Sequence, residues 1–142
     1  MRLWHKDLLS VLPRQQLLGQ WRECCAIAKN IAEKGTPNHV LVNKIMDYPL
    51  SHFYRYCGIV CDKMISRGYK VDWKNLTGYE GNEEYFWNKK NIVPYDVVFH
   101  EWHDYRSLRQ CYYNLQEKYD CKAITEEEWE KIDNYMKKKV KG

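Results

Sequence analysis

The hydrophobic positions of this chain recur mostly at helical spacing, and the longest such run lies near its start. Pro13 suits the first turn of a helix, where its missing amide hydrogen has no partner to lose, and Gly35 suits the end. Between them, apolar residues repeat every three or four positions: Leu17, Leu18, Trp21, Cys24, Cys25, Ala28, Ile31 and Ala32. The pattern predicts one long amphipathic helix between Pro13 and Gly35.

A second long helix is predicted over residues 51–67, with Gly68 as its stop signal. Its inward-facing positions are Phe53, Cys57, Val60, Cys61, Met64 and Ile65. Before it, residues 36–38 predict a turn, and we expect Asn38 to cap a short helix that ends ahead of Asp47.

The last third of the chain predicts two more helices. Residues 104–119 place one set of side chains on a common side: Leu108, Cys111, Tyr112, Leu115 and Tyr119. Thr125 and Glu128 have the spacing of a capping box, which would open a helix through Trp129, Ile132 and Met136. Residues 69–98 show no clear period. The fold expected for residues 1–142 is a single compact all-α domain, a helical bundle with an irregular, aromatic-rich middle segment.

Length and apolar patterning limit the class of protein. A chain of 142 residues is long enough to bury one hydrophobic core. No apolar stretch approaches the roughly 18 residues that span a bilayer, and no signal peptide opens the chain. We therefore expect a cytoplasmic monomer without membrane contact.

The net charge of +4 is unevenly distributed along the sequence. Residues 1–70 hold eleven Lys and Arg against five Asp and Glu, whereas residues 71–142 hold twelve against fourteen. A basic N-terminal half fits a polyanionic partner such as nucleic acid, although uneven solvation of the surface explains it equally well.

Six cysteines are present, and four of them fall on predicted apolar stripes, which favours buried free thiols over disulfides. Cys57 and Cys61 lie one helical turn apart and could bind zinc together with His52 or His103. Ordinary core thiols and histidines are the preferred interpretation. No metal or organic cofactor is predicted.

The start of the chain carries the most specific candidate chemistry. An α-amine has an unperturbed pKa of about 7.7–8.0, so a substantial fraction is a neutral nucleophile near pH 7. Here the amine belongs to Met1 and is followed at once by Arg2, and Arg22 and Glu23 follow on the first long helix. An amine beside an arginine, with a carboxylate near enough to shuttle protons, suits Schiff-base chemistry on a sugar aldehyde.

These residues resemble the bacteriophage-type pyrimidine-dimer DNA glycosylases, the endonuclease V type of repair enzyme. In that family a free α-amine is followed by arginine, and a helix carries a Leu-Leu/Met-x-x-aromatic-Arg-Glu run. The matching residues are Met1, Arg2, Leu17, Leu18, Trp21, Arg22 and Glu23. A weaker likeness extends to 67–69. The family's nucleophile is a small residue exposed by removal of the initiator methionine. Methionine before arginine is generally retained, so the Met1 amine takes its place here.

The resemblance implies a DNA-repair glycosylase with abasic-site lyase activity on damaged double-stranded DNA. Met1 and Glu23 would be catalytic, through an imine intermediate on the α-amine. Arg2 and Arg22 would hold phosphates, and the exposed cations Arg14 and Lys29 could add contacts to the DNA backbone.

Two departures from the family pattern stand out. Ala26 occupies the position, one helical turn beyond the glutamate, where the family usually has another arginine. A lysine-rich segment at 137–139 replaces the family's aromatic C-terminal tail, which is implicated in engaging the dimer. The chemistry could therefore be retained while the lesion differs.

Two other functions remain open at this point. The chain could be a non-catalytic nucleic-acid-binding module with the same fold and basic face. It could also be a protein-interaction or metal-binding domain in which the N-terminal likeness is incidental.

Overall fold

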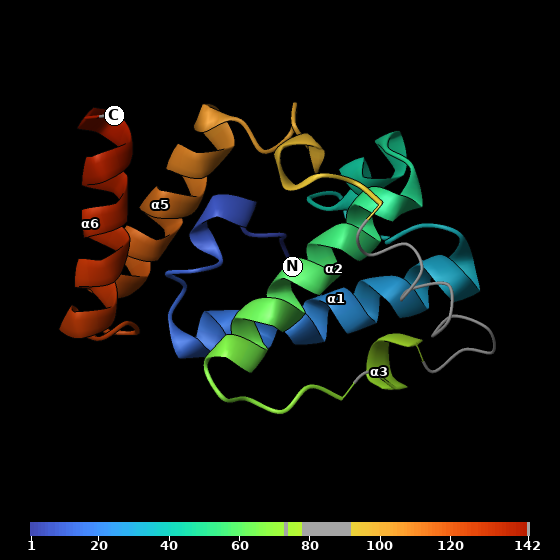
Figure 1. Ribbon diagram of the computed structural model, residues 1–142, viewed down its shortest axis with the longest axis horizontal. Helices are drawn as coiled ribbons and strands as arrows, with labels where there is room; N and C mark the ends of the chain where they lie inside the picture. The colour runs from blue at the N-terminus through green and yellow to red at the C-terminus, as the bar shows by residue number, and fades with distance from the viewer. Residues whose placement is uncertain (73, 78–91, 142) are drawn as a thin grey trace.

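The computed structural model describes residues 1–72, 74–77 and 92–141 (Figure 1). The elements are η1 (Lys6–Leu8), α1 (Arg14–Lys34), η2 (Asn43–Asp47), α2 (Leu50–Ser66), α3 (Lys74–Thr77), η3 (Tyr95–Val97), α5 (Tyr105–Asp120) and α6 (Glu126–Lys141), where η denotes a 3-10 helix. Within the described ranges all regular structure is helical, which confirms the predicted all-α fold. Much of the predicted irregular segment 69–98 lies outside these ranges.

Helix α1 begins and ends where the sequence predicts. Gly35 follows its last residue with φ of 76°, the left-handed conformation that glycine adopts without a steric penalty, and its N–H donates to the Ile31 carbonyl. The buried positions of the helix are Leu17, Gln20, Trp21, Cys24 and Ile27. One of these five, Gln20, is polar.

Helix α2 packs against α1, and the two cross near the centre of the molecule (Figure 1). Its predicted inward face is buried except at one position. Ile65 is 54% exposed, so its placement in the core was wrong. It lies in the last turn of α2, and the 100° step from buried Met64 turns it toward solvent.

The predicted capping role of Asn38 was also wrong. Asn38 has φ of 59°, and the short helix η2 begins only at Asn43, after Val42. Asparagine tolerates this left-handed conformation because its side chain is short and polar. The Asn43 side chain instead accepts a hydrogen bond from the His39 N–H at 3.0 Å.

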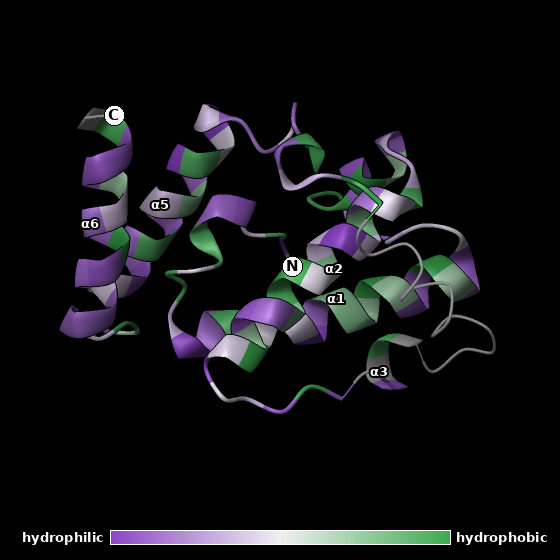
Figure 2. Ribbon diagram, viewed as in Figure 1, coloured by the Kyte–Doolittle hydropathy of each residue, from purple (hydrophilic) through white to green (hydrophobic). Residues whose placement is uncertain are grey.

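Helices α5 and α6 pack side by side as a pair (Figure 1). Asp104 caps α5 by accepting from the Ser107 N–H at 2.8 Å. The predicted capping box of α6 is confirmed, because Thr125 and Glu128 each accept a backbone N–H from the other at 3.1 Å. Figure 2 shows hydrophilic residues along much of α6, interrupted by hydrophobic ones, as expected for an amphipathic surface helix.

None of the six cysteines, all of which lie in the described residues, forms a disulfide, and the four that the pattern placed on apolar stripes are buried: Cys24, Cys57, Cys61 and Cys111. Within the described residues no group of three potential ligands could hold a metal ion, so the zinc alternative gains no support. In the same part of the chain, no helix is both long and apolar enough to cross a membrane.

The N-terminal segment 1–13 is part of the hydrophobic core. It runs between the α1–α2 pair and the α5–α6 pair (Figure 1), and its Leu8 and Leu9 side chains are fully buried. Burying a leucine side chain contributes roughly 1.5–3 kcal/mol. The segment is therefore anchored immediately after the residues proposed for chemistry.

Candidate active site

The first residues of the chain are held against α1 by side chains of that helix. The Arg2 N–H donates to Glu23 Oε2 at 3.2 Å. Gln20 Nε2 donates to the Arg2 carbonyl at 3.0 Å, and Gln20 Oε1 accepts from the Trp4 N–H at 2.7 Å. Gln20 and Glu23 lie three residues apart, so they share one face of α1.

This contact brings the Met1 amine close to the Glu23 carboxylate. Consecutive backbone nitrogens are at most about 3.6 Å apart. Added to the 3.2 Å hydrogen bond, this places the amine within about 7 Å of Glu23 Oε2. The structure thus assembles two residues that lie 22 positions apart in sequence, and Met1 is 37% exposed.

The surface beside Glu23 is only partly covered. Gly19 and Ala26 flank Glu23 one turn on either side, and both are half-buried. A Cβ placed on Gly19 would lie 3.7 Å from Arg22 Nη2, so the Arg22 guanidinium lies over this glycine. The small residue at 26 leaves room near the carboxylate, whereas the Arg22 side chain would have to move to open the surface at Gly19.

Arg2 points away from this surface and toward α5. Its guanidinium carbon lies 5.2 Å from the centre of the Trp4 ring, a cation–π distance, and its Nη1 is 4.0 Å from Cys111 Sγ. Burial raises the pKa of the Cys111 thiol, although the nearby Arg2 acts in the opposite direction. Of the predicted phosphate ligands, Arg2 is therefore the least available to solvent as the structure stands.

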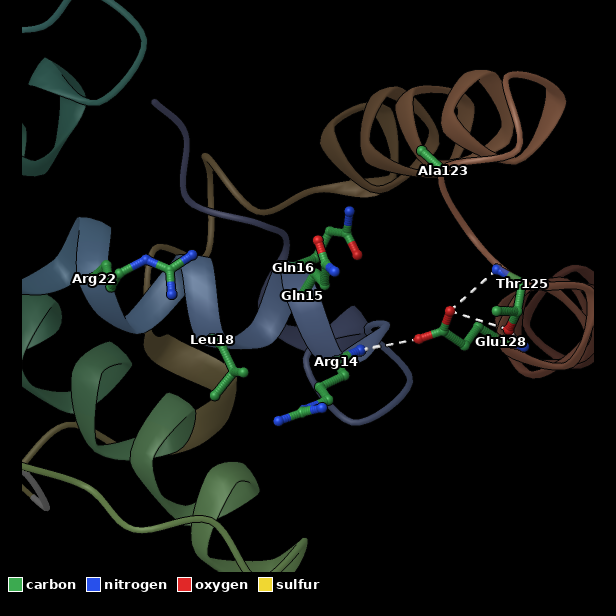
Figure 3. A pocket seen from close by; sticks show the side chains of 8 residues that line it. All are labelled: Arg14, Gln15, Gln16, Leu18, Arg22, Ala123, Thr125 and Glu128. Carbon is green, nitrogen blue, oxygen red and sulfur yellow. Dashed lines mark hydrogen bonds between the residues drawn. The ribbon is translucent and has the colours of Figure 1, made fainter.

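Arg14 and Arg22 line a groove of about 510 Å³ beside the N-terminal half of α1, which Figure 3 shows from close by. Lys29 is exposed further along the same helix. Each residue turns the helix by about 100°. Viewed along the axis of α1, the Arg22 and Lys29 side chains therefore project within about 20° of each other, whereas Arg14 projects about 80° from Arg22. These three predicted DNA-binding cations therefore follow one side of α1 over about 22 Å.

Glu128 reaches from α6 into the same groove. Its Oε2 accepts from the Arg14 N–H at 3.1 Å, while Oε1 accepts from Thr125 (Figure 3). Burial opposes the charged form, but these backbone donors hold the pKa of Glu128 below its usual value. One carboxylate therefore caps the first turns of both α1 and α6 and joins the two helix pairs.

Sequence reasoning missed two residues of this site, Gln20 and Tyr56. The Tyr56 side chain is fully buried, and its hydroxyl donates to the Trp4 carbonyl at 2.5 Å. Gln20 carried a usable signal, because it is a polar residue at a buried position of an otherwise apolar stripe. Tyr56 carried no such signal, because a tyrosine among the apolar positions of a helix is ordinarily interpreted as a packing residue.

A buried cluster of basic residues fixes the other end of the N-terminal segment. Lys6 Nζ donates to the Val98 carbonyl at 2.6 Å, and the Lys6 N–H donates to His103 Nδ1 at 3.0 Å. The rings of His5 and His103 stack with centres 5.0 Å apart. Burial, together with repulsion from His5 and Lys6, lowers the pKa of His103 to about 2. Burial in this cluster therefore favours the neutral forms of His5 and His103.

This pKa predicts a loss of stability in acid. Below pH 6.5 the unfolded chain protonates His103 and the folded chain does not, so the free energy of unfolding falls as the pH falls. The expected contribution is about 1.4 kcal/mol per pH unit between pH 6 and 4. Urea unfolding across this range tests it. His103→Asn keeps an acceptor for the Lys6 N–H but does not titrate, so it should remove the His103 part of the dependence of unfolding free energy on pH. An equal pH dependence in the variant and the wild type would contradict the role assigned to His103.

The comparison with known families concerns the same part of the chain. The family model described as pyrimidine dimer DNA glycosylase matches residues 1–75. The chain belongs to the pyrimidine dimer DNA glycosylase family. No curated protein and no solved structure matched it. The resemblance read from Met1, Arg2 and the α1 motif is thereby confirmed.

Membership in this family indicates a DNA-repair glycosylase with DNA as its substrate. The matched region contains the N-terminal segment, α1 and α2. The residues of the site described so far that lie outside it are Val98, His103, Cys111, Thr125 and Glu128. Helices α5 and α6 lie outside the match, yet α5 supplies Cys111 next to Arg2, and α6 supplies Glu128.

Proposed function

We propose that this protein is a DNA glycosylase with abasic-site lyase activity, whose nucleophile is the α-amine of Met1. The observation that carries the proposal is the hydrogen bond from the Arg2 N–H to Glu23, which holds the amine within reach of the carboxylate. The proposal requires Met1 to bear a free amine. The family match supports the substrate class, and the contacts support the roles of the residues.

The first step is attack of the neutral Met1 amine on C1′ of the damaged nucleotide. The new N–C1′ bond replaces the bond from C1′ to the base, which departs with the bonding electrons and takes up a proton. The sugar ring then opens to an imine between the Met1 nitrogen and C1′. Glu23, close to this nitrogen, stabilises the cationic iminium through its negative charge.

The second step is β-elimination, with Glu23 as the general base. The carboxylate takes a proton from C2′, the iminium accepts the electrons, and the bond from C3′ to its phosphate oxygen breaks. Water then hydrolyses the imine and frees the amine. The strand ends in an unsaturated aldehyde on one side and a 5′-phosphate on the other. Positioned acid–base catalysis contributes about 10²–10⁴-fold to such a step.

DNA binding is assigned to the basic side of α1, with Arg22 nearest the carboxylate and Arg14 and Lys29 further along. The nucleotide must leave the stack before its sugar is accessible, at a cost of a few kcal/mol in lost stacking. The half-buried surface at Ala26 offers space beside Glu23. Arg2 would have to turn from Trp4 to reach a phosphate. Its contacts with Trp4 and Cys111 support a second role, that of holding the first residues of the chain.

The phosphate contacts predict a steep salt dependence. Each phosphate neutralised contributes about −0.9 to the slope of log K against log salt, so three contacts give about −2.7. Fluorescence anisotropy with a duplex at several salt concentrations measures it. Arg14→Ala should make the slope about 0.9 less negative. Lys44→Ala, an exposed cation on η2, is the matched control and should leave it unchanged. A flat salt response would contradict this binding mode.

Cleavage of a duplex with one abasic site tests the activity itself. Untagged protein with a verified Met1 terminus should nick the strand on the 3′ side of the site without added metal. Salt-sensitive binding without any nick would favour the non-catalytic binding module instead. The family's description makes a pyrimidine dimer the first damaged base to test after the abasic site.

A further inference from the structure

The side-chain amide of Gln20 is buried at 1% exposure and has a peptide-like set of partners. Its Oε1 accepts from the Trp4 N–H at 2.7 Å, and its Nε2 donates to the Arg2 carbonyl at 3.0 Å. These two backbone groups lie on either side of Leu3. In a parallel sheet, the N–H and C=O of a single residue bind the two residues that flank its neighbour in the same pattern, so the Gln20 amide takes the place of one such residue.

Tyr56 fixes this amide from the other side. Its hydroxyl lies 2.5 Å from the Trp4 carbonyl and 3.0 Å from Gln20 Oε1. A hydroxyl has one proton to donate, so both acceptors compete for it and the Trp4 carbonyl is the nearer. Tyr56 comes from α2, whereas Gln20 comes from α1. The N-terminal segment is thus clamped from both helices of the α1–α2 pair.

The clamp holds four backbone groups: the Arg2 N–H at Glu23, the Arg2 carbonyl and the Trp4 N–H at Gln20, and the Trp4 carbonyl at Tyr56. The peptide group that joins Met1 to Arg2 is planar. Once the Arg2 N–H is fixed, the Met1 amine lies one rotatable bond, Cα–C of Met1, beyond this plane. Its distance from Glu23 is then set by a single torsion.

We propose that Gln20 and Tyr56 are positioning residues, which hold the Met1 amine near Glu23 for attack on the sugar. This inference rests on the proposed function. Gln20 Nε2 also donates to Glu23 Oε2 at 3.5 Å, so it acts on the proposed base as well as on the backbone, and both side chains are buried. A misplacement of about 1 Å in a reacting group can cost about 100-fold in rate, so loss of the clamp should slow the chemical step.

The test compares the rate of covalent trapping with the affinity for DNA. Borohydride reduces the imine formed on a duplex with one abasic site, and the trapping rate is measured at increasing protein concentration. Tyr56→Phe removes only the hydroxyl and should lower the saturating rate about 10-fold, while Gln20→Leu should lower it about 100-fold. The concentration that gives half the maximal rate should stay within about threefold of the wild type, because the basic side of α1 is unchanged.

Tyr112→Phe is the matched control. The Tyr112 hydroxyl donates to Asp133 Oδ1 at 2.9 Å between α5 and α6, so this variant also loses one tyrosine hydrogen bond, but away from the amine. It should trap at the wild-type rate. A general loss of rigidity would slow both variants equally, whereas positioning slows only Tyr56→Phe. Thermal unfolding identifies a variant that fails to fold. If Gln20→Leu fails to fold, the trapping rate of Tyr56→Phe alone tests the positioning role.

Each outcome points to one conclusion. A reduced saturating rate for Tyr56→Phe at unchanged half-saturation supports positioning. An unchanged rate, a slower Tyr112→Phe, or a loss explained wholly by weaker binding overturns it while the proposed function stands. Failure of the wild-type protein to trap at all overturns the proposed function, and the positioning role with it.

Discussion

Replacement of Glu23 by glutamine should reduce cleavage of abasic DNA by about 10²–10⁴-fold, the range that a positioned general base contributes. The side-chain amide has the size of the carboxylate, and its oxygen can still accept from the Arg2 N–H, which is 3.2 Å away in the native protein. The segment should therefore keep its position. What is lost is the negative charge that stabilises the iminium and the base that takes the C2′ proton.

DNA affinity separates this effect from damage to the binding surface. Removing a negative charge next to Arg22 should leave the affinity unchanged or strengthen it about threefold, because phosphates are no longer repelled there. Glu117→Gln, which removes an exposed carboxylate from α5, is the matched control and should cleave normally. Normal cleavage by Glu23→Gln would remove Glu23 from its proposed role.

Acetylation of the Met1 amine should abolish both base removal and strand cleavage. An amide nitrogen is not nucleophilic, so no imine can form, and the loss should exceed that of any side-chain variant. Binding should persist, since the cations that line α1 are untouched. The protein acetylated at its terminus, with mass spectrometry to confirm the site, should show wild-type anisotropy with abasic DNA and no nick.

A chain extended by one residue before Met1 provides an independent version of this test. The added residue moves the amine by up to about 3.6 Å while it remains an amine. Because the Arg2 N–H contact with Glu23 is unaffected, the protein should fold and bind normally but cleave slowly. Full activity in the acetylated protein would mean that a lysine side chain or water, and not the α-amine, is the nucleophile.

The helices were predictable because their signals are local. Pro13 and Gly35 mark the ends of α1, and the Thr125–Glu128 pair opens α6, each through contacts within a few residues. The errors arose where local signals were ambiguous. Asn38 is a good cap by residue type, yet it lies in a left-handed turn, and Ile65 has the spacing of a core residue in a turn that faces solvent.

The candidate site was predictable only in part. Met1, Arg2, Arg22 and Glu23 were recognised through the family motif, and the structure brings the amine and the carboxylate together. The clamp by Gln20 and Tyr56 required knowledge of contacts across 16 and 52 positions of sequence. Helical periodicity shows which residues are buried but not which distant backbone groups they meet.

The lysine-rich end of α6 shows a similar limit. The sequence showed residues 137–139 only as a lysine-rich replacement for the family's aromatic tail, yet Lys139 Nζ lies 3.3 Å from Asp7 Oδ2, next to the N-terminal segment. Tyr95 donates to the other oxygen of Asp7 at 2.5 Å. Burial opposes ionisation of Asp7, but the Tyr95 hydrogen bond and the charge of Lys139 hold its pKa below the usual value. The region outside the family match therefore helps to fix the segment inside it.

The most direct measurement is borohydride trapping on a duplex with one abasic site, using untagged protein whose Met1 terminus has been verified, followed by mass spectrometry of the adduct. We predict a covalent adduct on the Met1 amine that is absent after N-terminal acetylation. An adduct on a lysine side chain, or no adduct from protein that binds the same DNA, would contradict it.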